Sequence, residues 1–247
     1  MSDIVSIAGV PVWARAAALR SRRPVIIVVH GMTWTPETLR RDWPEAEDGL
    51  ERVYWRLPVL REDREAVEAR HQRDPFRGLY APAVAESREE LGRLVAAFAE
   101  RPVGLFGFSF GGLIALWGAA DQQGVRAAVS VGGVPSLEYL LDFYSDYNWL
   151  QPDVLRERRR HDISGNLGLL SGKATLILHG EEDDTIPWRV MADTAARLAQ
   201  TDPELHPFTL YPHVRHRLSG ESPEEEADLL RLKARATAFL RHALLGA

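Results

Sequence analysis

A strand–turn–helix signature at residues 103–117 constrains the fold of this chain more than any other segment. An apolar run at 103–106 precedes Gly-Phe-Ser-Phe-Gly at 107–111, and a second apolar run follows at 113–117. A serine between these glycines is the sequence form of a nucleophile elbow, a sharp turn from a strand into a helix. Side chains two residues before or after the serine would collide with the turn, so glycine suits both positions. The pattern predicts that Ser109 lies on a strained turn between a buried strand and a buried helix.

Strand and helix patterns alternate along the rest of the chain. Continuous apolar runs at 25–29 and 174–179 are typical of parallel strands that are buried on both faces. Further strands are expected at 53–58, 126–131 and 207–211, and an edge hairpin is expected around Ala8 and Gly9. The alternation predicts an α/β fold, with a mostly parallel sheet that is flanked by helices on both sides.

Capping signals predict where several helices begin. Thr35 before Pro36 predicts a short helix to about residue 43, and Ser222 before Pro223 predicts the last helix. Ser87, with a glutamate three residues later, reads as a capping box that begins a helix. Helices are also expected after the elbow to about residue 120 and near 188–199. Residues 61–86 are charged and irregular, and the sequence predicts no organisation for them.

Residues 135–170 are too long for an ordinary connection between a strand and the next helix or strand. They combine aromatic residues with acidic ones and then a basic segment of helical character. We therefore predict a small helical cap that is inserted between two strands. No internal repeat or linker is apparent, so residues 1–247 are expected to form a single domain.

Composition and charge exclude several classes of protein. The chain has 247 residues, 45% of them hydrophobic, with a formal net charge of -5 and no cysteine. The chain has no basic domain that would bind nucleic acid. Because it has no cysteine, disulfides and thiolate metal sites are impossible. Neither a signal peptide nor a membrane-length apolar run is visible, so we expect a cytoplasmic protein that does not bind membranes. We expect no metal or cofactor, and a monomer or homodimer that takes a small-molecule substrate.

A serine hydroxyl needs a base to accept its proton and a third group to orient that base. Asp183 lies in the acidic loop 180–187, which follows a buried strand and therefore reaches the same sheet edge as Ser109. His213 and His216 follow the last predicted strand. The chain order is therefore serine, aspartate, histidine, which is the order of α/β-hydrolases.

The chain resembles an α/β-hydrolase of the dienelactone-hydrolase and prolyl-oligopeptidase-like branch of bacterial serine esterases, from about Pro24 to Leu244. Three motifs carry the resemblance: His30-Gly31-Met32, the serine elbow at 107–111, and His179-Gly180-x-x-Asp183-x-x-Ile186-Pro187. The resemblance implies an α/β-hydrolase fold that carries a catalytic triad. An enzyme of this kind needs no cofactor.

Within the triad, the family's aspartate stands three residues after the glycine of the last motif, which favours Asp183 over Asp184. The family's histidine precedes a helix, which favours His216 over His213. Arg215 stands where the family often has glycine, and this departure leaves His213 as the alternative.

The resemblance also places an oxyanion hole, which needs two preorganised N–H donors. We expect one from Phe110, directly after the serine, and the other from Met32 in the turn after His30. His30 and His179 both end strands before a glycine, and for each we favour a structural hydrogen-bonding role over proton transfer.

Aromatic residues of the cap have two interpretations of equal weight: they line a substrate pocket, or they attach the cap to the core. Trp34 and Trp188 follow the two site loops and are also candidate pocket residues. The cap candidates are Tyr139, Phe143, Tyr147 and Trp149.

Together these patterns predict a metal-independent serine hydrolase that acts on carboxylic esters of small or medium acyl groups. The same triad also suits a peptidase, an amidase or a thioesterase, because substrate choice depends on pocket shape. A hydrolase fold that has lost activity and serves as a binding protein is a third hypothesis. Serine at position 109 disfavours a dehalogenase, which has an acid there, and a cysteine-type dienelactone hydrolase.

Overall fold

The computed structural model describes residues 2–44 and 46–246. Within these ranges the strands form one eight-stranded sheet with the order β1-β2-β4-β3-β5-β6-β7-β8. Strand β2 is antiparallel to both of its neighbours, and the strands from β4 to β8 along that order are parallel. The strands are β1 (Ser2–Ile7), β2 (Val10–Arg15), β3 (Val25–Val29), β4 (Glu51–Trp55), β5 (Val103–Phe108), β6 (Val125–Val131), β7 (Ala174–Gly180) and β8 (Phe208–Tyr211).

Helices cover both faces of the sheet, as the alternation of patterns predicts. The α-helices are α1 (Ala16–Arg20), α2 (Pro36–Asp42), α3 (Arg64–Arg73), α4 (Ala81–Ala97), α5 (Phe110–Asp121), α6 (Leu140–Phe143), α7 (Pro152–Arg160), α8 (Arg189–Thr201) and α9 (Pro223–Leu245). Short 3-10 helices are η1 (Pro58–Leu60), η3 (Leu137–Tyr139) and η4 (Ser164–Leu170), and η2 (Phe76–Tyr80) is a π-helix.

Two hydrophobic clusters divide the core because successive strand residues face opposite sides. Strand β3 shows the division: Val25, Ile27 and Val29 join the cluster under α4, α5 and α8, whereas Ile26 and Val28 join the cluster under α2 and α9. All five side chains are buried. The α/β fold expected from the sequence is therefore confirmed, with a sheet that is covered on both sides.

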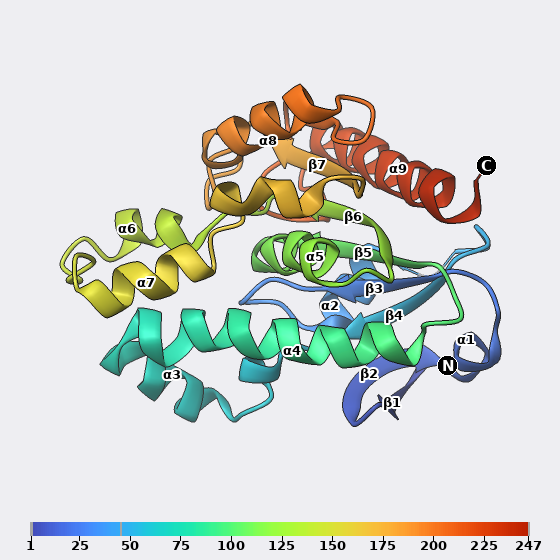
Figure 1. Cartoon of the computed structure of the whole chain (residues 1–247). Helices are drawn as coiled ribbons and strands as arrows, with labels where there is room; N and C mark the ends of the chain where they lie inside the picture. The colour runs from blue at the N-terminus through green and yellow to red at the C-terminus, as the bar shows by residue number, and fades with distance from the viewer. Residues whose placement is uncertain (1, 45, 247) are drawn as a thin grey trace.

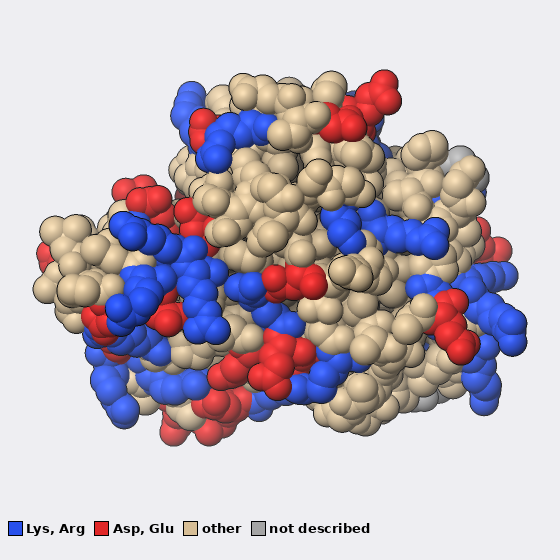
Figure 2. Space-filling view, viewed as in Figure 1, with Lys and Arg blue, Asp and Glu red and all other residues tan. Residues whose placement is uncertain are grey.

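A helical cap lies between β6 and β7, where the sequence predicts one. Its elements are η3, α6, α7 and η4, and Figure 1 shows α6 and α7 projecting beyond the sheet next to α3. The Arg77 side chain, from η2, bonds to Asp153 and Gln151 of the cap. Figure 2 shows basic side chains over this end of the molecule interspersed with acidic ones.

The predicted helix start at Ser87 is wrong. The π-helix η2 runs directly into α4, which therefore begins at Ala81, and Ser87 lies buried inside it. Among the described residues the Ser87 hydroxyl has no hydrogen-bond partner, so it caps nothing. Residues 61–86, for which the sequence predicts no organisation, contain α3 and η2. The last helix does begin as predicted, with Ser222 accepting a hydrogen bond from the Glu225 N–H.

Candidate active site

The elbow has the geometry that its glycines require. Ser109, between β5 and α5, has φ 58° and ψ -126°, a left-handed conformation that L residues rarely adopt. A Cβ on Gly107 would lie 2.0 Å from the Gly111 carbonyl oxygen, and one on Gly111 would lie 2.3 Å from the Val29 oxygen. The backbone therefore tolerates only glycine two residues before and two residues after the serine, and the turn presents Ser109 at the carboxyl edge of the sheet.

Three loops from three strand ends bring the predicted triad together. His216, in the loop after β8, has its Nε2 atom 2.8 Å from the Ser109 hydroxyl. Its Nδ1 atom lies 2.8 Å from Oδ2 of Asp183, in the loop after β7. The histidine side chain is 11% exposed and the aspartate side chain 1%. The arrangement gives the imidazole a proton acceptor position toward the serine and an anionic partner behind it.

Asp183 is held by donors on both carboxylate oxygens. Its Oδ1 accepts hydrogen bonds from the N–H groups of Thr185, at 3.0 Å, and Ile186, at 2.7 Å. Its Oδ2 lies 3.4 Å from Nε2 of His179, in addition to the contact with His216. Burial alone raises the pKa of this carboxyl, but the hydrogen bonds from His179, His216 and the Ile186 N–H outweigh it and lower the pKa to about 2. Asp183 is therefore an anion throughout the neutral range.

The two rival candidates from the sequence lie elsewhere. Asp184 is exposed, and its carboxylate accepts a hydrogen bond from the hydroxyl of its neighbour Thr185 at 3.4 Å. His213 bonds through Nδ1 to Oδ2 of Asp228, at 3.0 Å, and its own N–H donates to the same oxygen. That pair ties the loop after β8 to α9.

The turn after β3 lies directly beside the serine. A Cβ on Gly31 would lie 2.8 Å from the Ser109 Cβ, so this turn can approach the nucleophile only with glycine. Within the described part of the chain, neither the Met32 N–H nor the Phe110 N–H donates a hydrogen bond. Neither of the two N–H groups that the sequence predicts as oxyanion donors is therefore committed to another acceptor in this part of the chain.

The predicted pocket residues separate into two groups. Trp34 packs against Phe108, with ring centroids 4.4 Å apart, and Phe108 packs in turn against the His216 ring at 5.0 Å. Trp34 thus reaches the triad through one intervening ring. Trp188 is partly exposed beside α8, with the Arg189 guanidinium 4.8 Å from its ring.

The cap aromatics mainly contact each other and the segment 74–80. Tyr147 and Trp149 lie against one another and against Phe76, and the Tyr147 hydroxyl bonds to Asp74. Tyr139 is partly buried beside Phe143, which is itself 57% exposed. For Tyr147 and Trp149, these contacts match the interpretation that they attach the cap to the core.

A cluster formed by Tyr80, Tyr144 and His71 contacts Phe110, the residue after the serine, and was not predicted from the sequence. The Tyr80 ring lies 6.3 Å from the Phe110 ring and 6.3 Å from Tyr144, and burial raises the pKa of Tyr80. His71 bonds to the Tyr144 hydroxyl at 2.5 Å. Tyr80 and His71 fall in the stretch 61–86 that carries no clear periodicity, so the sequence held no signal for this cluster.

Comparisons with known proteins identify the family and the fold. A model of the prolyl oligopeptidase family matches residues 89–246, which is more than half of the chain. No curated protein matches the sequence. Among the described residues, no helix combines the length and apolar character needed to cross a bilayer.

Solved structures with the same fold include small hydrolases and peptidases. TT1662 from Thermus thermophilus has a TM-score of 0.76 at 22% identity, covering 99% of this chain and 98% of its own. A puromycin-hydrolyzing peptidase from Mycobacterium tuberculosis has a TM-score of 0.71 at 15% identity, covering 99% of this chain but 39% of its own. A putative dienelactone hydrolase from Klebsiella pneumoniae has a TM-score of 0.58 at 17% identity, covering 95% of this chain and 97% of its own. These likenesses show the α/β-hydrolase fold, and with the family match the chain belongs to the prolyl oligopeptidase family of serine hydrolases.

Proposed function

We propose that this protein is a carboxylesterase-type serine hydrolase that cleaves esters of small or medium acyl groups, with Ser109, His216 and Asp183 as its catalytic triad. The observation that carries the proposal is the unbroken line of contacts from Asp183 through His216 to Ser109, at 2.8 Å each. Such a line is what converts a weakly nucleophilic hydroxyl into an attacking group.

In the acylation half, Ser109 Oγ attacks the ester carbonyl carbon while His216 Nε2 accepts the hydroxyl proton. The carbonyl oxygen becomes an oxyanion that accepts hydrogen bonds from the N–H groups of Met32 and Phe110. Asp183 holds the imidazole with its Nδ1–H inward and stabilises the imidazolium that forms. His216 then donates its proton to the leaving alcohol, and the acyl group stays on Ser109.

In the deacylation half, His216 accepts a proton from water as the water oxygen attacks the acyl carbon. The second tetrahedral intermediate uses the same two N–H donors. When it collapses, the acid leaves and Ser109 Oγ recovers its proton from His216. We further propose that Trp34, Tyr139, Phe143 and Trp188 contribute to the surface that receives the substrate.

A peptidase or amidase is the second candidate, and the family match favours it. Structures of the same fold include a puromycin-hydrolyzing peptidase and an acylaminoacyl peptidase from Pyrococcus horikoshii, although the chain covers only 39% and 41% of those proteins. A thioesterase would use the same residues. Each of these alternatives changes the substrate and keeps the triad.

Hydrolysis of p-nitrophenyl esters from acetate to decanoate, with wild type beside Ser109→Ala, tests the proposal. We expect serine-dependent turnover with an optimum at short or medium chain length. Parallel assays with p-nitroanilides and acyl thioesters identify the alternatives. If no substrate is turned over and a fluorophosphonate does not label Ser109, the protein is a binding protein on a hydrolase fold and the proposal is wrong.

A further inference from the structure

His30, the residue after β3, is buried and uses both ring nitrogens. The Leu57 N–H donates to His30 Nε2 at 3.3 Å, so the ring proton belongs on Nδ1. That Nδ1–H donates to the Gly31 carbonyl oxygen at 2.7 Å. Burial lowers the pKa of His30 to about 4, so the ring is neutral and keeps this one tautomer at neutral pH.

The Gly31 carbonyl and the Met32 N–H belong to the same peptide group. A trans peptide is planar, and its C=O and N–H bonds point in opposite directions. The carbonyl is held by His30 and also accepts the Trp34 N–H at 3.2 Å. Fixing the carbonyl therefore fixes the direction of the Met32 N–H, in a turn so close to the nucleophile that a Cβ on Gly31 would lie 3.2 Å from the Ser109 hydroxyl oxygen.

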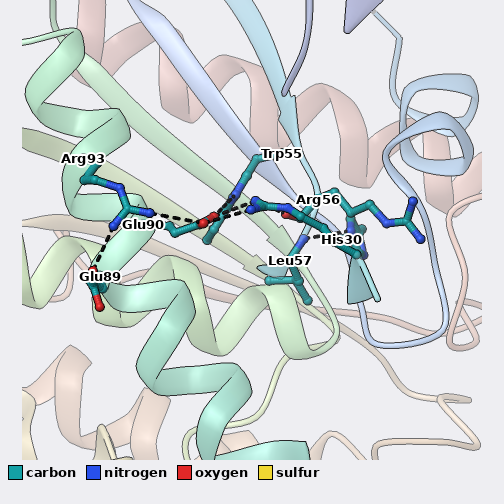
Figure 3. A network of polar contacts seen from close by, with 8 residues as sticks. His30, Trp55, Arg56, Leu57, Glu89, Glu90 and Arg93 are labelled. Carbon is teal, nitrogen blue, oxygen red and sulfur yellow. Dashed lines mark hydrogen bonds and ion pairs between the residues drawn. The ribbon is translucent and has the colours of Figure 1, made fainter. Parts of the chain in front are cut away.

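The same device repeats one step behind His30, in the network that Figure 3 shows. The Leu57 N–H shares its peptide group with the Arg56 carbonyl, and that carbonyl accepts a hydrogen bond from Arg61 Nη2 at 2.8 Å. Arg61 in turn binds Glu90 of α4 through two contacts, at 2.8 and 2.5 Å. A line of donors and acceptors thus runs from Glu90 through Arg61, the Arg56–Leu57 peptide and His30 to the Gly31–Met32 peptide.

From Arg61 to the Gly31 carbonyl, every hydrogen bond in this line points the same way, whereas Glu90 only accepts from Arg61 and holds its guanidinium in place. A cation at one carbonyl makes the N–H of that peptide a better donor, and hydrogen bonds in series polarise one another. The Arg61 guanidinium therefore strengthens the Leu57 N–H, which strengthens the His30 Nδ1–H, which strengthens the Met32 N–H. The end of the line is the group that would meet the developing negative charge of the substrate.

We propose that His30 is a positioning residue for the oxyanion hole, and that the line from Arg61 through His30, hereafter the relay, sets both the direction and the donor strength of the Met32 N–H. This inference rests on the proposed function, because it takes the Met32 N–H as an oxyanion donor. According to this inference, His30, which lies outside the triad, affects how well the transition state is stabilised.

Two isosteric variants separate the two bonds of His30. In His30→Asn the side-chain amide NH2 takes the place of Nδ1–H and can still donate to Gly31. In His30→Gln the amide oxygen takes the place of Nε2 and can still accept from Leu57, but the donor to Gly31 is lost. The two variants change the same buried site, and their side chains differ in volume by only one methylene group.

The readouts are kcat and KM on p-nitrophenyl acetate, the rate constant for phosphonylation of Ser109 by a fluorophosphonate, and the melting temperature. Loss of an oxyanion donor costs about 10²–10³ in kcat, so a misdirected one is expected to cost about 10- to 100-fold. We expect that loss for His30→Gln, with KM nearly unchanged, and less than about threefold loss for His30→Asn. Equal losses in the two variants, or losses that follow the melting temperature, would overturn the positioning role.

His206→Gln is the control for removing a buried histidine. His206 is 2% exposed and bonds through Nδ1 to the Thr175 hydroxyl, near the start of β7 and away from Ser109. We expect it to lower the melting temperature without changing the phosphonylation rate. A rate loss equal to that of His30→Gln would mean that general destabilisation explains both.

Arg61→Met and Arg93→Met test the relay without touching a fully buried side chain. Both arginines bind Glu90, Arg93 at 3.2 Å, but only Arg61 also donates to the Arg56 carbonyl. We expect Arg61→Met to slow phosphonylation about three- to tenfold and Arg93→Met to leave it unchanged. Equal rates in the two variants would remove Arg61 from the relay. Wild-type protein that is never labelled would refute the proposed function itself, whereas labelling that is indifferent to His30 would refute only this inference.

Discussion

Replacing Asp183 by asparagine should disable the histidine while preserving the shape of the site. Asp183 Oδ1 accepts two backbone N–H groups, from Thr185 and Ile186, so the oxygen of an asparagine amide will take that place. The amide NH2 then faces His216 Nδ1 and can only donate to it. The imidazole is forced into the tautomer with its proton on Nε2, which cannot accept the proton of Ser109.

The expected loss in kcat follows from the wrong tautomer of His216, and the expected loss in stability follows from removing the charge of Asp183. A wrong tautomer of this kind lowers kcat about 10⁴-fold, which is about 5.4 kcal/mol of transition-state stabilisation. In the fold, the pKa of Asp183 decreases from 3.8 to about 2, which corresponds to roughly 2 kcal/mol at about 1.4 kcal/mol per pKa unit. The side chain is 1% exposed, so solvent screens little of this energy. For a domain of this size the melting temperature should fall by roughly 4–8 °C at pH 7.

The charge-dependent part of the stability has a defined pH window. A carboxyl whose pKa is lower in the folded state stabilises the fold fully above its unfolded pKa and loses that effect as the pH falls through the folded pKa. The difference in melting temperature between wild type and Asp183→Asn should therefore be constant above about pH 4 and shrink toward pH 2.

The assay is kcat on p-nitrophenyl acetate together with thermal unfolding from pH 7 down to pH 2.5. Asp184→Asn is the matched control, because this neighbouring aspartate is exposed. We expect the control to keep wild-type kcat and melting temperature. If Asp183→Asn keeps more than about a tenth of the activity, or if Asp184→Asn is the variant that loses it, the tautomer argument is refuted.

The loop after β8 supports two further predictions. His216→Ala should remove nearly all esterase turnover, whereas His213→Ala, which breaks only the contact with Asp228, should keep most of it; the reverse order in kcat measurements would exchange the two assignments. Glu225→Ala should lower both kcat and the melting temperature. The buried Glu225 carboxylate accepts hydrogen bonds from the N–H groups of Arg215, at 3.4 Å, and Glu221, at 2.9 Å, which lie before and after His216 in the chain. Hydrogen bonds to a charged group contribute about 1.5–3 kcal/mol each. Glu224→Ala, at an exposed neighbour, is the control, and equal effects of the two variants on the melting temperature and kcat would contradict this role of Glu225.

The sequence was most informative where chemistry depends on local backbone geometry. The elbow around Ser109 was predictable because two glycines, a preceding strand and a following helix all lie within fifteen residues. The acid loop was predictable for the same reason, since Asp183 follows a buried strand at a short and regular spacing. Parallel strands then bring both loops to one sheet edge, whatever the details of packing.

Local signals failed where the neighbouring segment decides the structure. Ser87 has the sequence of a helix cap, but η2 packs in continuation with α4 and turns the serine into a buried residue in mid-helix. His213 and His216 lie in one short loop, and the sequence favoured His216 only through the family's pattern, from which Arg215 departs. Their different partners, Asp228 on α9 and Asp183 after β7, are distant in the chain, and only tertiary structure brings each pair together.

The relay behind the proposed oxyanion donor at Met32 depends still more on tertiary structure. Its links are peptide groups after β3 and β4 and side chains from the η1 segment and α4. Backbone donors and acceptors are the same in every residue, so no residue pattern can reveal which peptide faces which. The sequence therefore determined which groups are proposed to carry the chemistry, because those depend on residue type and local turns. Only the tertiary structure decided how they are aimed, because orientation depends on hydrogen bonds between segments that are far apart in the chain.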